Sequence, residues 1–474
     1  MSAVGARASV LGYAPAVGPH LPVRELTSPA TGSPGRHLLL TTEAAESLLE
    51  TLASAASAWR AVPLPQRATA IARAAEALRR PGHPGRRQAL AAGAAWTGRA
   101  EGMLADSLDF FLGKLRRHAL LEEAKRCGLE STAEARDGGA PALVLHWLAG
   151  NTPWAGLESL AVATLGGSAS LVKVARAEPV FASMFAQALA ASHPILAEAL
   201  VVAYWDGATD TALDSVLAAR LAAVVAFGSD ASIRSLHARF GRGGTSGYSG
   251  GWPRRFIAHG HRLSVAVLGE AAWRAGESSA LAERVALDHV LEDQSGCLSP
   301  RGVYLVGEIG EENRAEAAHL AHQVATALEV WERRWPRAPI ATHEAVRVQQ
   351  LRDVARLRGG RVWAPPDATA WTVLLETGAA AEEAFEPSPE ARFVHLRHCA
   401  SLETALASLR PLRGVLSTVA CDGFPPAEEA ARKLARDLAP DRLCATGTMQ
   451  RPPLGWNHDG ASDLALLLGT SEVP

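Results

Sequence analysis

The stretch PALVLHWLAGNTPW, residues 141–154, decides the fold of this 474-residue chain. An apolar run between Pro141 and Gly150 is typical of a buried strand that ends in a loop. Apolar runs and helical patterns then alternate: SLVKVA, ALVVAYW and LAAVVAFGS as strands, with GLESLAVATLGG, EPVFASMFAQALAAS and DTALDSVLAA as helices. Strands joined by helices of this length predict right-handed crossovers and a doubly wound parallel sheet.

A second α/β alternation begins at RRFIAHGHRLSVAVLG and runs to about residue 445. We therefore predict an α/β protein with two doubly wound domains. Residues 1–40 are expected to be irregular, apart from a short strand at 36–41. Residues 41–255 form a helical region and the first domain, residues 256–445 form the second, and the Gly- and Pro-broken tail, 446–474, packs at a domain or subunit interface.

Composition excludes several classes of partner and site. The net charge is −2, so the chain lacks the basic surface that nucleic acid or an anionic membrane would require. No run of about 18 apolar residues is present, and no metal site is expected. The five cysteines are odd in number and form no C-x-x-C pair, which argues against disulfides and zinc and favours a reducing cytoplasm. They are Cys127, Cys297, Cys399, Cys421 and Cys444.

Candidate functional residues follow the expected strands. Doubly wound sheets bind ligands beyond the carboxyl ends of their strands, which points to the loops AGNTPW, KVARAEP and FGSDAS. None of these loops contains the usual G-x-G-x-x-G dinucleotide signature. In the second alternation, Cys297 lies in LEDQSGCLSPRG, residues 291–302, just after a predicted helix. A helix end and the neighbouring Gly296 would leave backbone N–H groups available to a reactive thiol.

The segments GNTPW, DHVLEDQSGCLSP and TMQRPPLGWNHDG resemble the LuxC-type acyl-CoA reductases, the fatty acyl reductase component of bacterial bioluminescence. Trp59, Arg67, LVKVARAEP and FGSD extend the resemblance to the wider aldehyde dehydrogenase superfamily. It covers roughly residues 50–470. The resemblance implies an aldehyde-dehydrogenase-like fold, with a nicotinamide-dinucleotide-binding domain first, a catalytic domain second and a small oligomerisation segment.

Two residues are candidates for the chemical step. The resemblance makes Cys297 the nucleophile, whereas most cytosolic cysteines are buried packing residues, as we expect of the other four. It also implies that the Asn151 amide and the Cys297 N–H bind the oxyanion. The alternative for Asn151 is that it caps the helix that begins near Pro153.

Four residues are candidates for cofactor binding. The resemblance places Lys173 on the adenosine ribose, and Gly228 and Ser229 on the pyrophosphate at a helix N-terminus. Arg176 stands where the superfamily commonly has an acidic residue that binds the ribose hydroxyls, which favours NADPH over NADH. The alternatives are a solvated arginine at 176 and an ordinary helix cap at Ser229.

One departure from the oxidising aldehyde dehydrogenases concerns the general base. Their E-L-G-G glutamate is replaced by Ile257 in IAHGHRLS, so the base that activates water is missing. His259 and His261 are close enough in sequence to substitute for it, although a structural role is the alternative.

Two further groups of polar residues carry weaker signals. His319 and His322 are expected at the surface, since no third ligand completes a metal site. The WNHDG segment, residues 456–460, is assigned a structural or gating role.

The predicted function is NADPH-dependent reduction of an acyl thioester, from acyl-CoA or an acyl carrier, to the aldehyde through an acyl-Cys297 intermediate. An acyl-activating partner enzyme and a homo-oligomer are expected. The alternatives are a CoA-independent aldehyde dehydrogenase and a catalytically silent, acyl-carrying subunit of a biosynthetic complex.

Overall fold

The structure is a computed structural model that describes residues 10–15, 18, 20–129, 140–207, 210–241, 255–274, 278–366 and 368–470. The chain forms two compact units. Unit 1 comprises Met1–Thr97, Ala105–Gly260 and Pro453–Pro474, and unit 2 comprises Gly98–Leu104 and His261–Pro452. Apart from the short excursion of Gly98–Leu104, the chain thus passes from unit 1 to unit 2 after residue 260, later than the predicted boundary at residue 255, and returns to unit 1 after residue 452.

Unit 1 contains the first predicted parallel sheet, with strand order β6-β5-β4-β7-β8. The strands are β4 (Leu143–Trp147), β5 (Ala169–Lys173), β6 (Leu200–Ala203), β7 (Ala223–Phe227) and β8 (Arg255–His259). The connecting helices are α6 (Trp154–Gly166), α7 (Phe181–Ser192), α8 (Thr211–Arg220) and α9 (Asp230–Phe240), with a 3-10 turn at Pro194–Ala197. The strand order reverses between β4 and β7, so the loops after these strands lie where ligands bind in such sheets.

The segment RRFIAHGHRLSVAVLG contributes to both sheets. Its first half is β8, which pairs in parallel with β7 in unit 1, so that Ile257 lies opposite Val225. Its second half is β9 (Leu263–Gly269), which lies between β10 and β14 in the sheet of unit 2. The assignment of residues 256–260 to the second domain was therefore wrong. Gly260 and the polar residues around it interrupt the apolar pattern at the place where the chain leaves the first sheet.

Helices cover the amino-terminal part of unit 1, as predicted: α1 (Thr42–Ala61), α2 (Leu64–Arg79), α3 (Pro84–Thr97), α4 (Glu101–Lys114) and α5 (Arg117–Arg126). Thr41 caps the first of these, since its hydroxyl accepts a hydrogen bond from the Ala44 N–H at 3.4 Å. Trp59, buried on α1, donates its indole N–H to the Thr164 carbonyl of α6 at 2.8 Å.

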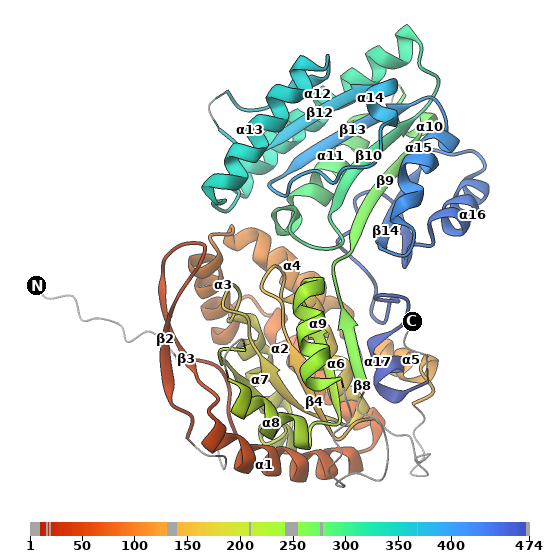
Figure 1. The fold of residues 1–474 in the computed structure, drawn as a ribbon. Helices are drawn as coiled ribbons and strands as arrows, with labels where there is room; N and C mark the ends of the chain where they lie inside the picture. Colours follow the sequence, from red (N-terminus) through yellow and green to blue (C-terminus); the bar gives the residue numbers. More distant parts are fainter. Residues whose placement is uncertain are drawn as a thin grey trace, which may run out of the picture. The chain divides into compact units, whose positions relative to one another are not determined.

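The described part of residues 1–40 contains more regular structure than was predicted, since only the strand expected at 36–41 overlaps an observed one, β3. Strands β1 (Val10–Leu11), β2 (Val23–Thr27) and β3 (Pro34–Leu38) form a small sheet, in which β2 and β3 are an antiparallel hairpin (Figure 1). Ser28 anchors the hairpin turn because its hydroxyl donates to the Trp96 carbonyl at 2.6 Å and accepts from the Ala30 and Thr31 N–H groups. The Gly and Pro residues that suggested irregular structure are turn residues here.

Unit 2 contains the second sheet, with strand order β11-β12-β13-β10-β9-β14-β15. Its further strands are β10 (Pro300–Val306), β11 (Arg361–Trp363), β12 (Thr372–Thr377), β13 (Phe393–Cys399), β14 (Leu416–Asp422) and β15 (Arg442–Cys444). The short edge strand β11 is antiparallel to β12, and the other pairings are parallel. The prediction of a mixed α/β protein with parallel sheets is confirmed.

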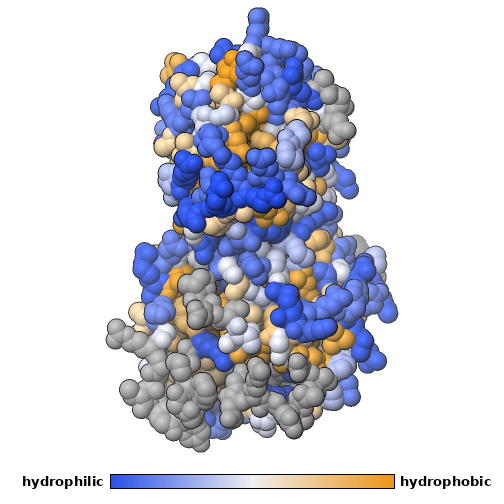
Figure 2. Space-filling view, turned by 90° about the vertical axis from the view of Figure 1, so that its right-hand side faces the viewer, coloured by the Kyte–Doolittle hydropathy of each residue, from blue (hydrophilic) through white to orange (hydrophobic). Residues whose placement is uncertain are grey.

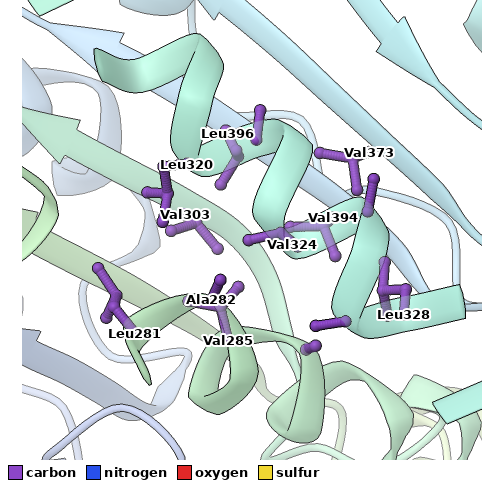
Figure 3. Close-up of a cluster of buried hydrophobic side chains, with 14 of the residues drawn as sticks. Leu281, Ala282, Val285, Val303, Leu320, Val324, Leu328, Val373, Val394 and Leu396 are labelled. Carbon is purple, nitrogen blue, oxygen red and sulfur yellow. The ribbon is translucent and has the colours of Figure 1, made fainter. Parts of the chain in front are cut away.

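Helices pack on both faces of the second sheet. They are α10 (Glu270–Trp273), α11 (Ser278–Val290), α12 (Glu311–Arg334), α13 (Thr342–Leu357), α14 (Ala379–Glu382), α15 (Leu402–Leu409) and α16 (Ala427–Leu438), with 3-10 turns at Leu291–Gln294 and Arg410–Leu412. Side chains of α11 and α12 interdigitate with Val303, Val373, Val394 and Leu396 of the strands (Figure 3). Neighbouring strand residues such as Val265 and Tyr304 point to the opposite face, where α15 and α16 cover them.

Hydrophilic residues cover most of the described surface on the face shown in Figure 2, and apolar residues appear there in small groups. Among the described residues, no helix combines the length and the apolar character needed to cross a membrane.

A glycine tests the packing of unit 1. Gly167 ends α6 with φ +91, and a Cβ there would overlap the guanidinium of the buried Arg67. We expect Gly167→Ala to lower the free energy of unfolding by roughly 1–3 kcal/mol, since both backbone strain and a clash oppose it. Gly113→Ala in α4 is the control, because nothing lies within 4 Å of its added Cβ, and it should be neutral or slightly stabilising. Thermal unfolding of the two variants checks this; equal stability would contradict it.

Candidate active site

Cys297 lies in a short loop between α11 with its 3-10 extension and β10, as the sequence predicted, and is half-buried. Its carbonyl accepts a hydrogen bond from the Ser264 hydroxyl at 2.7 Å. The same hydroxyl accepts from the Thr418 N–H at 3.1 Å. The cysteine backbone is therefore fixed to the amino ends of β9 and β14.

The residues before Cys297 form a left-handed turn. Glu292, Asp293 and Gln294 have φ values of 54, 51 and 65, a conformation that residues with a Cβ rarely adopt. Each such residue costs about 1–2 kcal/mol relative to the right-handed form, so three in succession require strong support from their surroundings. Strain of this kind is concentrated at functional sites in proteins, where it sets the direction of a reactive side chain.

Gln294 supplies the central support of this turn. Its side chain is fully buried and donates to the Pro300 carbonyl at 2.9 Å and to the Phe393 carbonyl at 3.0 Å. Its oxygen accepts from the Phe393 N–H at 2.6 Å. One amide thus ties the turn to the start of β10 and the start of β13.

The two acidic residues of the turn are each held by an arginine. Arg99 donates to the Glu292 carboxylate at 2.8 Å and to the Ser295 hydroxyl at 2.5 Å. Arg392, which is 0% exposed, donates twice to one Asp293 oxygen, at 3.0 and 2.6 Å. Desolvated ion pairs of this kind add little net stability but strongly favour one arrangement of the groups that they join.

The tail segment TMQRPP also contacts the cysteine loop within unit 2. The Gln450 side chain donates to the Leu291 carbonyl at 3.2 Å and to the Ser299 hydroxyl. A Cβ on Gly296 would lie 3.3 Å from the Gln450 amide oxygen, so a small residue suits this position. Sequence reasoning did not assign roles to Arg99, Gln294, Arg392 or Gln450; only the placement of Gln294 and Gln450 in segments that resemble the family could have indicated them.

The other four cysteines are in surroundings that disfavour the thiolate. Burial raises the pKa of Cys127 and Cys421 to about 11 and that of Cys399 to about 12. Burial also raises the pKa of Cys444. A thiol with such a pKa is almost entirely protonated at neutral pH and is a poor nucleophile. Cys127 and Cys399 are buried, in agreement with the expectation that they are packing residues, whereas Cys421 and Cys444 are half-buried.

The candidates in unit 1 lie at the carboxyl edge of its sheet. Asn151 is exposed in the loop between β4 and α6. Helix α6 begins after Pro153, whose own side chain provides no cap. The oxyanion role and the helix-capping role of Asn151 both stay predictions.

Lys173 ends β5 with its ammonium over two aromatic rings, 4.7 Å from the Trp147 ring centroid and 5.6 Å from that of Tyr204. Burial lowers the pKa of Lys173 to about 8, although nearby Asp206 acts in the opposite direction. An ammonium that is desolvated in this way gains from a polar or anionic ligand.

Ser229 caps α9, since its hydroxyl accepts from the Ser232 N–H at 3.3 Å. The alternative that Ser229 caps a helix is therefore confirmed. Its binding of the cofactor pyrophosphate stays a prediction. Gly228 donates its N–H to the His259 carbonyl at 3.1 Å.

Arg176 is exposed, but it does more than contact solvent, because its Nε donates a hydrogen bond to the Thr27 carbonyl of β2 at 2.9 Å.

The histidines have different surroundings. His259 is buried at the end of β8, with Nδ1 2.8 Å from Asp459 and Nε2 3.1 Å from Asp463. His261 is exposed and belongs to unit 2. His319 and His322 are exposed on α12, as predicted. Sequence reasoning did not foresee that Asp459, in WNHDG, pairs with His259, 200 residues away.

Comparison with known proteins assigns the family. A sequence model described as acyl-CoA reductase (LuxC) matches residues 44–469. The chain belongs to the LuxC acyl-CoA reductase family. Membership confirms the predicted family and the predicted activity, reduction of an acyl-CoA by an oxidoreductase. No curated protein matches this LuxC-family sequence.

Solved structures share the fold of this LuxC-family chain at low identity. An NAD-dependent benzaldehyde dehydrogenase from Corynebacterium glutamicum matches with TM-score 0.66 and 14% identity, over 92% of this chain and 93% of that one. A methylmalonate-semialdehyde dehydrogenase from Oceanimonas doudoroffii gives 0.70 and 14%, over 97% and 96%. An E. coli NADP dependent enzyme gives 0.71 and 13%, over 94% and 93%. The aldehyde-dehydrogenase-like fold is therefore confirmed.

The role of Gln294 can be measured directly. We expect Gln294→Ala to lower the free energy of unfolding by roughly 2–3 kcal/mol, because it leaves buried backbone groups of Pro300 and Phe393 without their partner. Acylation of Cys297 by acyl-CoA should slow by about tenfold or more, since a displaced nucleophile attacks poorly. Gln350→Ala, on the exposed surface of α13, should change neither property. A folded Gln294→Ala protein that is acylated at the unmodified rate would show that the turn does not orient the thiol.

Proposed function

We propose that this protein reduces an acyl thioester to an aldehyde with NADPH, through an acyl group carried on Cys297. The observation that carries the proposal is the left-handed turn of residues 292–294. Each of its three side chains is held by an ion pair or hydrogen bonds, and the turn leads directly to the one cysteine that lies in a family signature. Preorganisation of this kind suits a nucleophile.

The proposed chemistry has two stages. The Cys297 thiolate attacks the thioester carbonyl, a tetrahedral intermediate forms, and the C–S bond to CoA breaks so that CoA leaves as a thiolate. Hydride addition to the acyl-cysteine then gives a thiohemiacetal, which releases the aldehyde and restores the Cys297 thiolate. Asn151 and the Cys297 N–H are the proposed donors to the oxyanion at both stages.

The residues of unit 1 fit a nicotinamide dinucleotide, which supplies the hydride when bound. Lys173 offers a buried ammonium beside the Trp147 ring, suited to ribose hydroxyls. Gly228 and Ser229 precede the N-terminus of α9, an eleven-residue helix whose dipole favours a pyrophosphate. Arg176, anchored on the β2–β3 hairpin through Nε, is the proposed partner of a 2′-phosphate. A nicotinamide dinucleotide is the general part of the proposal. The preference for NADPH over NADH is its more specific part and depends on Arg176.

The surroundings of His259 argue against the alternative of a CoA-independent aldehyde dehydrogenase that uses this residue as a base. Burial tends to lower the pKa of His259, but Asp463 and Asp459 together raise it to about 10. An imidazole that is protonated at neutral pH cannot take a proton from water. Ile257, at the position of the missing glutamate, is buried and apolar.

Two expectations about partners stay predictions. An acyl carrier or an acyl-activating enzyme as donor, in place of free CoA, is one of them. A homo-oligomer is the other.

The test of the proposal is a single turnover with acyl-CoA and NADPH. Cys297→Ala should lose both the covalent acyl adduct, detected by intact mass, and aldehyde formation. Cys444→Ala is the control, because the pKa of this half-buried thiol is raised and the adduct should persist without it. A thioester adduct that survives in Cys297→Ala would overturn the assignment, and a native protein that binds no NADPH would favour the silent acyl-carrying subunit.

Cofactor preference follows from Arg176. The unmodified protein should bind NADPH more tightly than NADH, and Arg176→Glu should reduce or invert this preference. A lost ion pair to phosphate corresponds to about 1.5–3 kcal/mol, or roughly a tenfold to hundredfold change in affinity. Fluorescence titration with both cofactors measures it, with Arg87→Glu, exposed on α3, as the control for charge reversal. Equal affinities in the unmodified protein would refute the prediction.

The replacement of the glutamate base by Ile257 predicts which acceptor takes the acyl group from Cys297. Because no base activates water, aldehyde plus NADP should yield little free acid, and adding CoA should produce the acyl thioester instead. Product analysis with and without CoA decides this. Rapid release of free acid without CoA would show that another group supplies the base, and the protein would then be an oxidising aldehyde dehydrogenase.

A further inference from the structure

A buried ionic cluster closes the carboxyl end of β8 in unit 1. His259 is its centre and is 3% exposed. Its Nδ1 is hydrogen bonded to Asp459 at 2.8 Å, and its Nε2 lies 3.1 Å from Asp463 at the start of α17 (Asp463–Leu468). The second contact has the distance of an ion pair but not the alignment of a hydrogen bond.

The histidine carries a proton in this cluster. Burial would favour the neutral ring, but the carboxylates of Asp463 and Asp459 raise the pKa of His259 to about 10. The same attraction lowers the pKa of Asp463. One imidazolium between two carboxylates therefore holds the tail to the sheet by charge as well as by packing.

Aromatic rings extend the cluster in both directions. The His259 ring stacks on Phe227 with centroids 4.5 Å apart and on His458 with centroids 4.0 Å apart. His458 in turn stacks on Trp456 at 4.9 Å. Phe227 is the last residue of β7, directly before Gly228 and Ser229. The stack thus runs from the proposed pyrophosphate loop to the tail.

A metal centre is the competing explanation, since donor atoms of His259, His458 and Asp463 lie within 4.8 Å of one another. The ring planes of the two histidines differ by only 15° in a stacked arrangement. Lone pairs of stacked rings lie in separate, nearly parallel planes, whereas a zinc ion needs each donor ring to point at it. Both nitrogens of His259 also face carboxylates. The geometry therefore fits an imidazolium better than a metal ligand.

The backbone connects this cluster to the turn after β7. His259 accepts the Gly228 N–H through its carbonyl at 3.1 Å, and the Ser229 hydroxyl caps α9 in the next residue. The chain leaves unit 1 one residue after His259 and re-enters it at Pro453, shortly before Asp459 and Asp463. The cluster joins these two passages of the chain within unit 1.

We infer that His259 is a positioning residue. Clamped between Asp459 and Asp463, it holds residues 453–463 against the turn of residues 227–229 and so keeps that turn in the form that receives the cofactor pyrophosphate. The effect on pyrophosphate binding rests on the proposed function of Gly228 and Ser229, whereas the clamp between His259 and the two aspartates does not.

Hydrogen exchange in the absence of cofactor tests the clamp. His259→Gln removes the charge, and Asp463→Asn is the milder variant, because Asp459 still pairs with the histidine. Amides of residues 226–233 and 453–463 should exchange at least about tenfold faster in both variants, while those of β4 and β5 stay protected. Unchanged exchange at 226–233 in a folded Asp463→Asn protein would overturn the inference.

His146→Gln is the matched control for loss of a buried histidine in the same sheet. Its ring is 0% exposed and bonds to two hydroxyls, Ser159 at 3.0 Å and Ser170 at 3.1 Å. Burial lowers the pKa of His146 to about 4, so this histidine is neutral. This variant should not accelerate exchange at residues 226–233 or 453–463. Acceleration there equal to that of Asp463→Asn would mean general loosening of unit 1 and would overturn the clamp.

Two further measurements separate the clamp from the proposed function. NADPH should bind about tenfold or more weakly to His259→Gln and Asp463→Asn, while acylation of Cys297 by acyl-CoA, which needs no cofactor, stays within about twofold. Faster exchange with unchanged NADPH affinity would support the clamp and contradict the assignment of Gly228 and Ser229 to the pyrophosphate. Stoichiometric zinc in the purified protein, with loss of protection at 453–463 on chelation, would overturn the imidazolium clamp in favour of a metal centre.

Discussion

The left-handed turn at residues 292–294 is the constraint on which the arrangement of the cysteine loop depends. Three residues with a Cβ stay in an unfavourable conformation because Arg99, Arg392 and the backbone groups of Pro300 and Phe393 bind their side chains. The partners come from segments far apart in the sequence, so the turn forms only when unit 2 has folded. The backbone that leads to Cys297 is thus held by tertiary contacts.

Surroundings, more than residue type, separate the chemical roles in this protein. All five cysteines carry the same thiol group, and burial raises the pKa of four of these thiols. Two buried histidines of one sheet differ in the same way, since His146 meets hydroxyls and stays neutral whereas His259 meets carboxylates and is protonated. A histidine held as an imidazolium is suited to fixing structure and unsuited to accepting a proton.

The apolar periodicity predicted much of the fold. Strand β4 and the alternation after it followed from runs such as PALVLHW, because buried parallel strands are continuously apolar and their crossover helices are amphipathic. Two misreadings share one cause. Strand β2 was taken as irregular, and RRFIAHGHRLSVAVLG was assigned to one domain, because turn residues and a single glycine do not reveal which sheet a neighbouring strand joins.

The sequence by itself determined the family, the α/β class and the place of Cys297 after a helix, since these depend on local patterns and on signature segments. Only the tertiary structure decided what supports that cysteine and what His259 does. The Arg392 contact with Asp293 spans 99 residues and the His259 contact with Asp459 spans 200. Charge pairing at such separations leaves no periodic trace in the sequence, because it depends on which strands and segments the fold brings together.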